Sequence, residues 1–218
     1  MSERALRDEI VACTQELDAS GLNRGSSGNI SARCGNVLLI TPSGVPARAL
    51  EPRMLARMPL DDACGAWEGP LKPSSEWRFH LDLMRARPDF NAVVHTHSPF
   101  ATILSIARRP IPAVHYMMAA FGGAEIRCSD YACYGTAELS DAVLRAIDGM
   151  AGCLMSNHGA VVGGPNLTRT CWLAHELEAL AHQYFHVLQI GGGHILNDAD
   201  LAETAKGFAG YGVQERKG

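Results

Sequence analysis

Hydrophobic residues along the chain recur at two spacings, one near 3.6 residues and one of two residues, which together predict alternating helices and strands. Near the N-terminus, Leu6, Ile10, Cys13 and Leu17 share one face of an amphipathic helix that ends at Ser20-Gly21. Further helical patterns follow Pro73 and extend over residues 98–108, 136–147 and 166–189. Short apolar runs at 37–40, 92–97, 154–155 and 160–162 predict strands.

Small and polar residues separate these elements and predict loops. Residues 24–31 read Arg-Gly-Ser-Ser-Gly-Asn-Ile-Ser, and residues 41–44, Thr-Pro-Ser-Gly, have the composition of a turn. Ser74 or Ser75 is the predicted N-cap of the helix after Pro73, so that Glu76 lies in its first turn, where the helix dipole favours a carboxylate. No repeat or linker interrupts the pattern. We expect one mixed α/β domain over residues 1–218, with a strand order that the pattern does not give.

Composition narrows the classes of protein. The 218 residues are 47% hydrophobic and 19% charged, which is enough apolar surface for a substantial core. A net charge of -4 argues against a general nucleic-acid binder. No apolar run approaches the roughly 20 residues of a membrane span, and the charged start does not resemble a signal peptide. These features predict a cytoplasmic protein with no membrane partner.

Cysteine and lysine limit the chemistry further. The 7 cysteines contain no Cys-x-x-Cys pair, which argues against a disulfide framework or an all-cysteine zinc site and favours small core residues. Lysine occurs only at positions 72, 206 and 217, and position 217 lies next to the end of the chain. Catalysis through a lysine Schiff base needs a desolvated amine, and these positions offer few candidates.

A metal site is suggested by His95-Thr96-His97 at the end of an apolar strand. Residues i and i+2 of a strand share a face, so both imidazoles point the same way and form half of a site suited to zinc. The alternative is a hydrogen-bonded or surface pair. A third ligand must come from elsewhere, and His158 in the turn Asn157-His158-Gly159 is the candidate.

A rival set of histidines lies on the last long helix, at positions 175, 182 and 186. His182 and His186 have the i, i+4 spacing of a helical zinc pair. The glutamate of the metalloprotease pattern His-Glu-x-x-His is missing, however, and apolar residues surround both histidines. We interpret these histidines as polar positions on a packing helix.

Acid–base and phosphate chemistry have candidates too. Glu76 follows two hydroxyls and precedes Trp77, and a carboxylate beside an aromatic ring can serve as an acid or base near neutrality. The alternative is a glutamate that only satisfies the helix dipole. Three loops, at 25–29, 43–44 and 74–75, offer hydroxyls and backbone N–H groups to a phosphate, although none has a Walker A or Gly-x-Gly-x-x-Gly motif.

Several segments taken together resemble the class II aldolase/adducin family, over about residues 6 to 211. The segments that carry the resemblance are 28–31, 41–44, 73–80, 92–97, 111–118, 134–136, 158–159 and 172–176. The resemblance implies a central, largely antiparallel sheet flanked by helices, and a homotetramer with sites between subunits.

The resemblance also implies roles for individual residues. The zinc ligands are His95, His97 and His158, joined in the absence of substrate by Glu76, which is also the catalytic carboxylate. The phosphate-binding positions are Gly28, Asn29, Ser43, Gly44, Ser74 and Ser75, where Ser43 replaces a threonine and keeps the hydroxyl. Tyr116 is implied as a proton donor contributed across a subunit boundary. Tyr134, Phe208 and Tyr211 are implied on the aldehyde side.

The implied reaction is the reversible, zinc-dependent cleavage of a ketose 1-phosphate to dihydroxyacetone phosphate and a short aldehyde. The substrate would be L-fuculose 1-phosphate, 5-deoxyribulose 1-phosphate or 5-methylthioribulose 1-phosphate. Another divalent metal is an alternative to zinc. Alternatives are a sugar-phosphate 4-epimerase, which in this family carries Asp where this chain has Glu76, and a methylthioribulose-1-phosphate dehydratase. A non-catalytic adducin-like module is a further alternative, but it is expected to have lost the metal ligands.

Overall fold

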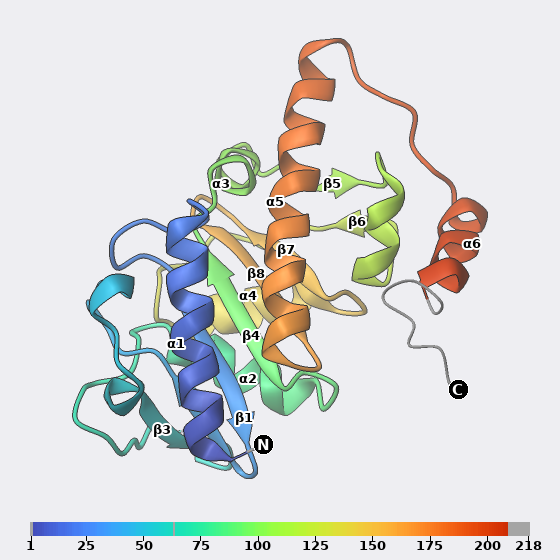
Figure 1. Cartoon of the computed structure of the whole chain (residues 1–218). Coiled ribbons are helices and arrows are strands. Elements are labelled where there is room, and N and C mark those ends of the chain that lie inside the picture. Colours follow the sequence, from blue (N-terminus) through green and yellow to red (C-terminus); the bar gives the residue numbers. More distant parts are fainter. Residues whose placement is uncertain (1, 63, 209–218) are drawn as a thin grey trace, which may run out of the picture.

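The computed structural model describes residues 2–62 and 64–208, and in them the chain builds a six-stranded antiparallel sheet between two layers of helices (Figure 1). The strand order is β3-β2-β1-β4-β8-β7. The strands of this sheet are β1 (Asn29–Cys34), β2 (Val37–Ile40), β3 (Ala56–Pro59), β4 (Ala92–Thr96), β7 (Gly152–Met155) and β8 (Gly159–Gly164). A separate two-stranded ribbon pairs β5 (Ile111–Pro112) with β6 (Glu125–Ile126).

The helices are α1 (Glu3–Ala19), α2 (Trp77–Ala86), α3 (Pro99–Ile106), α4 (Ala137–Ile147), α5 (Leu167–Gln189) and α6 (Asp198–Phe208). Three short 3-10 helices, η1 (Ala47–Ala49), η2 (Pro52–Met54) and η3 (Tyr116–Phe121), lie in the connections. Among the described residues, no helix combines the length and the apolar character that crossing a membrane requires.

Each face of the sheet has its own apolar core. Ile30 of β1 and Val94 of β4 belong to a core that α1, α3 and α5 cover. The opposite face carries Val93 and Val161 and packs against α2 and α4. Because successive strand residues alternate between faces, polar residues at 29, 31 and 95 must point toward α2 and α4. The site is built on this second face.

The pattern of apolar residues predicted most of these elements. The helices over α1, α2, α3, α4 and α5 and the strands β2, β4, β7 and β8 are confirmed, as are the turn at 41–44 and the mixed α/β class with an antiparallel sheet. The loop predicted for residues 24–31 is wrong at its end, because β1 begins at Asn29. The elements β3, β5, β6 and α6 were not predicted, since they are short or expose much of their length.

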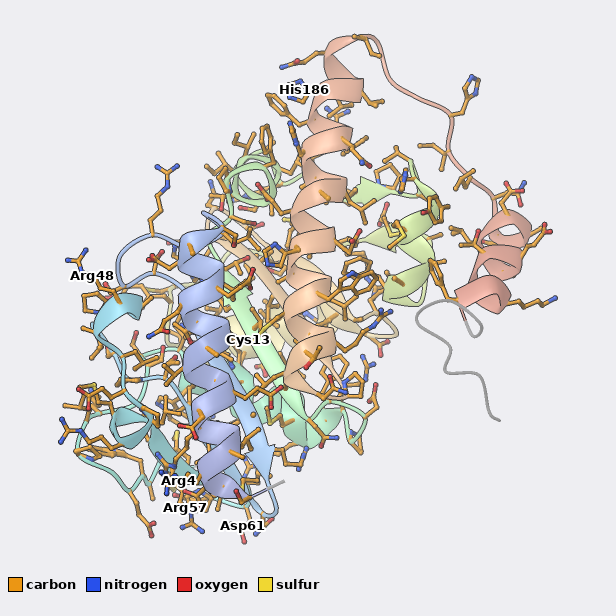
Figure 2. All side chains as sticks on the ribbon, in the orientation of Figure 1. Arg4, Cys13, Arg48, Arg57, Asp61 and His186 are labelled. Carbon is orange, nitrogen blue, oxygen red and sulfur yellow. A yellow bond between two sulfur atoms is a disulfide. The ribbon has the colours of Figure 1, made fainter. Side chains whose placement is uncertain are left out.

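The cysteines agree in part with their predicted role. Cys153 and Cys171 are buried, and Cys13, Cys34 and Cys128 pack against a core, whereas Cys64 and Cys133 are exposed. The structure also joins Cys13 of α1 to Cys171 of α5 by a disulfide, which the sequence did not predict. The two residues are 158 positions apart and meet only because these helices lie side by side over the sheet (Figures 1 and 2).

Candidate metal centre and active site

His95 and His97 stand where β4 ends, on the face of the sheet that α2 covers. His95 lies directly opposite Asn29 of β1 in the strand register, and its ring packs edge-on against Phe79 of α2 at a centroid distance of 5.6 Å. His95 is fully buried and His97 is exposed. The strand therefore presents one imidazole inside the protein and one at its rim, as residues i and i+2 of a strand should.

The third histidine comes from the β7–β8 hairpin. Its turn is held by α3, because Ser105 accepts hydrogen bonds from the backbone N–H groups of Asn157 and His158 at 3.1 and 3.3 Å. Asn157 has a φ of 54°, a left-handed conformation that asparagine tolerates better than most residues. A Cβ at Gly159 would lie 2.3 Å from the carbonyl oxygen of Thr96, so glycine lets the hairpin approach the end of β4 closely.

The imidazole nitrogens of His95, His97 and His158 converge within 4.8 Å of one another. The ring centroids are 4.8 to 5.0 Å apart and the rings meet edge to face. Nδ1 of His95 donates to the carbonyl oxygen of Ala160 at 2.9 Å, which leaves Nε2 free to act as a ligand. Burial first, and then the neighbouring imidazoles, lower the pKa of His95 well below its ordinary value. A neutral ring with a free nitrogen is the state that binds metals.

The Glu76 carboxylate lies against this cluster. Its Oε2 is 3.3 Å from Nε2 of His95, and its Oε1 is 3.3 Å from Nε2 of His158. The residue is 7% exposed, and Oε1 is a buried atom without a hydrogen-bond partner among the described residues. Glu76 itself is the N-cap of α2, and not Ser74 or Ser75 as predicted, because the turn from Ser74 to Trp77 delays the start of the helix. Its side chain does not cap the helix, and the carboxylate reaches the histidines instead.

These donors fit a metal ion. Neighbouring ligands of one tetrahedral zinc stand about 3.3 Å apart when each is about 2.0–2.1 Å from the metal. The separations of 3.0 Å between the Nε2 atoms of His95 and His97, and of 3.3 Å from Glu76 to two histidines, match that edge. Three imidazoles, with a carboxylate oxygen that has no hydrogen-bond donor in the part of the chain that the structure describes, are a donor set suited to a divalent metal.

The three loops proposed for phosphate meet beside this cluster. The N–H of Ser74 donates to the carbonyl of Thr41, and the N–H of Ser43 donates to the carbonyl of Lys72, so the loops at 41–44 and 72–76 run together. Thr41 also accepts from Ile30 of β1, which brings the 25–29 loop alongside. Ser43, Gly44 and Ser75 are exposed, whereas Asn29 and Ser74 are buried. The loops that carry the six predicted phosphate positions are thus joined by hydrogen bonds, and two of these positions, Asn29 and Ser74, contact Glu76.

Two of the predicted aromatic residues, Tyr116 and Tyr134, lie on the surface. Tyr116 begins η3 and is 50% exposed, with its ring 4.6 Å from that of His115 and 6.3 Å from that of Phe208. Tyr134 is 66% exposed, and its neighbour Gly135 lies so close to Ser75 that a Cβ would stand 2.8 Å from the carbonyl oxygen of that serine. Tyr134 is therefore near the proposed phosphate loops. Tyr211 lies outside the described residues.

The histidines of α5 have structural partners. His175 lies 2.8 Å from a carboxylate oxygen of Glu16 on α1, and the ring of His182 stacks on Phe100 at 4.1 Å. His186, close to the C-terminal end of the helix in Figure 2, contacts Gln189 at 3.0 Å. These contacts agree with the interpretation of polar positions on a packing helix. Of the lysines, Lys72 and Lys206 are exposed, as an enzyme without a Schiff base allows.

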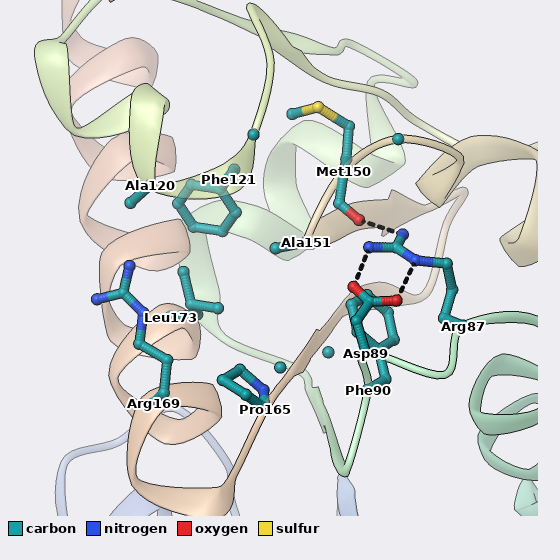
Figure 3. A pocket seen from close by; sticks show the side chains of 14 residues that line it. Arg87, Asp89, Phe90, Ala120, Phe121, Met150, Ala151, Pro165, Arg169 and Leu173 are labelled. Atoms are coloured by element: carbon teal, nitrogen blue, oxygen red, sulfur yellow. Dashed lines mark hydrogen bonds and ion pairs between the residues drawn. The ribbon is translucent and has the colours of Figure 1, made fainter. Parts of the chain in front are cut away.

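A cavity of about 360 Å³ lies away from this site, between the end of β8, α5 and the segments around Phe121 and Met150 (Figure 3). Arg87 at its rim is already paired with Asp89 at 2.7 Å and donates to the carbonyl of Met150 at 2.9 Å. None of the predicted site residues lines it. The chemistry is therefore concentrated at the histidine cluster.

Sequence reasoning missed two residues that shape the site. Asn23 accepts the N–H of His97 at 3.0 Å, and its side chain fills the space that a Cβ at Gly28 would occupy, 2.3 Å away. His80 is fully buried and bonds to Asn29. The spacing of four residues between Glu76 and His80 could have placed both on one side of α2, whereas Asn23 gave no signal.

Comparisons with known proteins agree with this geometry. Residues 8–185 match the family described as Class II Aldolase and Adducin N-terminal domain. The chain is 46% identical over 211 residues to the 5-methylthioribulose-1-phosphate/5-deoxyribulose-1-phosphate aldolase of Rhodospirillum rubrum, covering 97% of this chain and 94% of that protein. It is 40% identical to the L-fuculose phosphate aldolase of Escherichia coli K12, covering 98% and 99% of the two chains. A solved L-fuculose 1-phosphate aldolase superposes with a TM-score of 0.90 at 32% identity, covering 94% of this chain and 96% of that one. The chain belongs to the class II aldolase/adducin family.

Proposed function

We propose that this protein is a zinc-dependent aldolase that reversibly cleaves a ketose 1-phosphate to dihydroxyacetone phosphate and a short aldehyde. The observation that carries the proposal is the convergence of three imidazole nitrogens, two of them 3.3 Å from the Glu76 carboxylate, next to loops that carry exposed hydroxyl groups. The named activities of the relatives, on 5-methylthioribulose, 5-deoxyribulose and L-fuculose phosphates, support it. The presence of all three histidines weighs against a non-catalytic module.

His95, His97 and His158 would hold the metal, with Glu76 as a further ligand when no substrate is present. When bound, the metal would act as a Lewis acid toward the negative charge that C–C cleavage places on the ketone oxygen. The protein prepares for this by keeping His95 neutral through burial and by fixing its tautomer with the Ala160 carbonyl. Zinc suits neutral imidazole ligands, and another divalent metal is the alternative.

Glu76 would carry the proton at the nucleophilic carbon of the donor. Its carboxylate lies at the histidine cluster, with Oε2 held by Nδ2 of Asn29 at 2.9 Å and Oε1 without a hydrogen-bond donor among residues 2–62 and 64–208. An anchored oxygen fixes the direction of the carboxylate, and an unoccupied one can accept or return a proton. Positioning of this kind is worth several orders of magnitude in rate when the reacting atoms are in contact.

The phosphate of the donor would bind at Gly28, Asn29, Ser43, Gly44, Ser74 and Ser75. These positions offer neutral N–H and hydroxyl donors, and the binding energy they supply is remote from the carbon that reacts. Tyr116 would serve the aldehyde-side oxygen of a neighbouring subunit in a homotetramer, a role that its exposed position permits. Tyr134, Phe208 and Tyr211 would line the aldehyde side.

Residues 1–218 would act as one catalytic domain in the cytoplasm, where phosphorylated sugars are made and consumed. The proposal is tested by incubating the purified, zinc-loaded protein with L-fuculose, 5-deoxyribulose and 5-methylthioribulose 1-phosphates and following dihydroxyacetone phosphate. The control is His95→Ala, which removes a central ligand. Borohydride added with substrate tests for a lysine adduct.

Release of dihydroxyacetone phosphate by the loaded protein, and its loss in His95→Ala, is the expected result. Conversion of a ketose phosphate to its 4-epimer with no net cleavage would assign the epimerase reaction instead. No turnover of any of the three substrates, or a lysine trapped by borohydride, would overturn the proposal.

A further inference from the structure

A chain of buried polar side chains runs behind Glu76, between β1 and α2. Ser31 Oγ lies 2.7 Å from Nδ1 of His80, and Nε2 of His80 lies 2.5 Å from Oδ1 of Asn29. Asn29 then donates from Nδ2 to Oε2 of Glu76 at 2.9 Å. Ser31 and His80 are fully buried, and Asn29 is 6% exposed. These side chains therefore connect Glu76 to the protein interior through hydrogen bonds that are shielded from solvent.

The chemistry of the acceptor at its end fixes the direction of every bond in this chain. A carboxylate only accepts hydrogen bonds, so the amide of Asn29 must turn its NH₂ toward Glu76 and its carbonyl toward His80. Nε2 of His80 must then carry the hydrogen, and Nδ1 must accept from the hydroxyl of Ser31. Burial is the largest cause that lowers the pKa of His80 to about 3, which agrees with a neutral ring that has one donor and one acceptor.

The opposite tautomer would have a cost at Glu76. With the hydrogen on Nδ1, His80 would present an acceptor to Asn29, and the amide would turn to donate to it. The carbonyl oxygen of Asn29 would then face the carboxylate, and two acceptors would meet in a buried place without a proton between them. The ring of His80 also stacks on Phe79 at 4.5 Å, which fixes its plane.

We propose that His80 is a positioning residue for this aldolase: its Nε2–H orients the Asn29 amide, which holds one oxygen of Glu76 in place and leaves the other free for the proton. The inference rests on the proposed function, because it assigns His80 to the same proton transfer. It does not require His80 to touch substrate or metal. The residue acts through Asn29.

Two variants that place an amide side chain at position 80 distinguish this positioning role from a role in packing alone. The side-chain nitrogen of glutamine reaches about as far as Nε2 of histidine, whereas asparagine reaches only about as far as Nδ1. His80→Gln therefore keeps a donor for Asn29, and His80→Asn keeps only the partner of Ser31. Both put a buried amide at one place, so a purely structural role predicts losses of similar size.

We expect His80→Asn to lower kcat roughly ten- to a hundredfold, the usual effect of removing a residue that orients a ligand or base. KM should change less, since the remaining phosphate positions are intact. His80→Gln should restore kcat to within about threefold of wild type. The exposed His182→Asn is the matched control and should leave both constants unchanged.

A measurement independent of activity is made on the wild-type protein with ¹⁵N-labelled histidine. The His80 ring resonances, assigned in the wild-type protein through bonds from the backbone of His80, should show a neutral ring protonated at Nε2. This reading holds even where both variants fail to fold. A neutral ring protonated at Nδ1 would overturn the inference, and so would equal kcat values for the folded Gln and Asn variants. A wild type without aldolase activity would instead count against the proposed function, and the tautomer would still be decided.

Discussion

Gly159 is the position where one added methyl group should damage the metal centre most directly. It follows His158, a proposed metal ligand, and begins β8, which pairs with β4, the strand that contains His95 and ends just before His97. A Cβ there would stand 2.3 Å from the carbonyl oxygen of Thr96 and 3.2 Å from Cδ2 of His97. The first atom is backbone and cannot rotate away. Gly159→Ala therefore requires the hairpin to move relative to the end of β4.

The size of the effect follows from that overlap. Ordinary contact of a Cβ with a heavy atom begins at 3.4 Å, so His158 must shift by about 1 Å relative to His95 and His97. Overpacking of this kind costs about 1–3 kcal/mol of stability. In a chain of this length each kcal/mol lowers the Tm by about 2–4 °C. Metal affinity should fall about ten- to a hundredfold, as when the support of a ligand is lost.

The assay compares zinc affinity by competition with a coloured chelator, and Tm with and without zinc. Gly207→Ala is the control, because a Cβ at this helical glycine meets nothing within 4 Å, and its stability should be unchanged or slightly higher. A Gly159→Ala protein with wild-type zinc affinity and wild-type Tm would show that the close approach of the hairpin does not set the site.

Four further outcomes are expected. Glu76→Gln should keep its fold and zinc while kcat falls about 10²- to 10⁴-fold, and near-normal turnover would require another base. Chelation should abolish activity and lower the Tm, and zinc should restore both; activity that survives complete metal removal would contradict the metal mechanism. Unphosphorylated dihydroxyacetone should fail as a donor, whereas lactaldehyde, acetaldehyde and methylthioacetaldehyde should react within about two orders of magnitude of one another in kcat/KM. The pKa of His80 is about 3 in the folded protein and about 6.5 in the unfolded chain, so the unfolded chain binds a proton first as pH falls below about 6.5. The free energy of unfolding should therefore fall, by at most about 1.4 kcal/mol per pH unit from this residue. Urea titrations at several pH values should show a smaller pH dependence in His80→Gln.

The spacing of apolar residues in the sequence was sufficient to predict the helices and strands that have long or fully buried apolar stretches. The helices at α1 and α5 and the strand at β4 bury enough side chains for their period to be visible. The start of β1 was hidden, because Asn29 and Ser31 are polar yet buried, with their partners on α2. Hydrophobic periodicity assigns such polar residues to a loop. Only the tertiary contacts make a strand of them.

Some residues of the candidate site could likewise be predicted from the local sequence, and others could not. His95 and His97 could be paired from strand alternation alone, since the geometry of one strand decides it. His158 and Glu76 were candidates from their local sequence, but that they lie beside His95 and His97 follows from the β4–β8 pairing and the unexpected N-cap position, so only the family resemblance joined all four in one site. Asn23 and the Cys13–Cys171 disulfide depend on contacts between distant segments, and nothing in the local sequence marks them.

The location of the polar residues on the second face of the sheet argues for the functional interpretation of the whole cluster. Ser31, His80 and His95 are fully buried where apolar residues such as Phe79 and Val93 otherwise fill the core. Replacing a buried polar network with apolar side chains of the same shape is often neutral or stabilising, so stability alone does not require it. The network is also directional, and each of its bonds leads toward the same carboxylate oxygen of Glu76. A fold that needed only a core would have no reason to align donors in this way, whereas a base that must hold one oxygen still and keep the other free requires it.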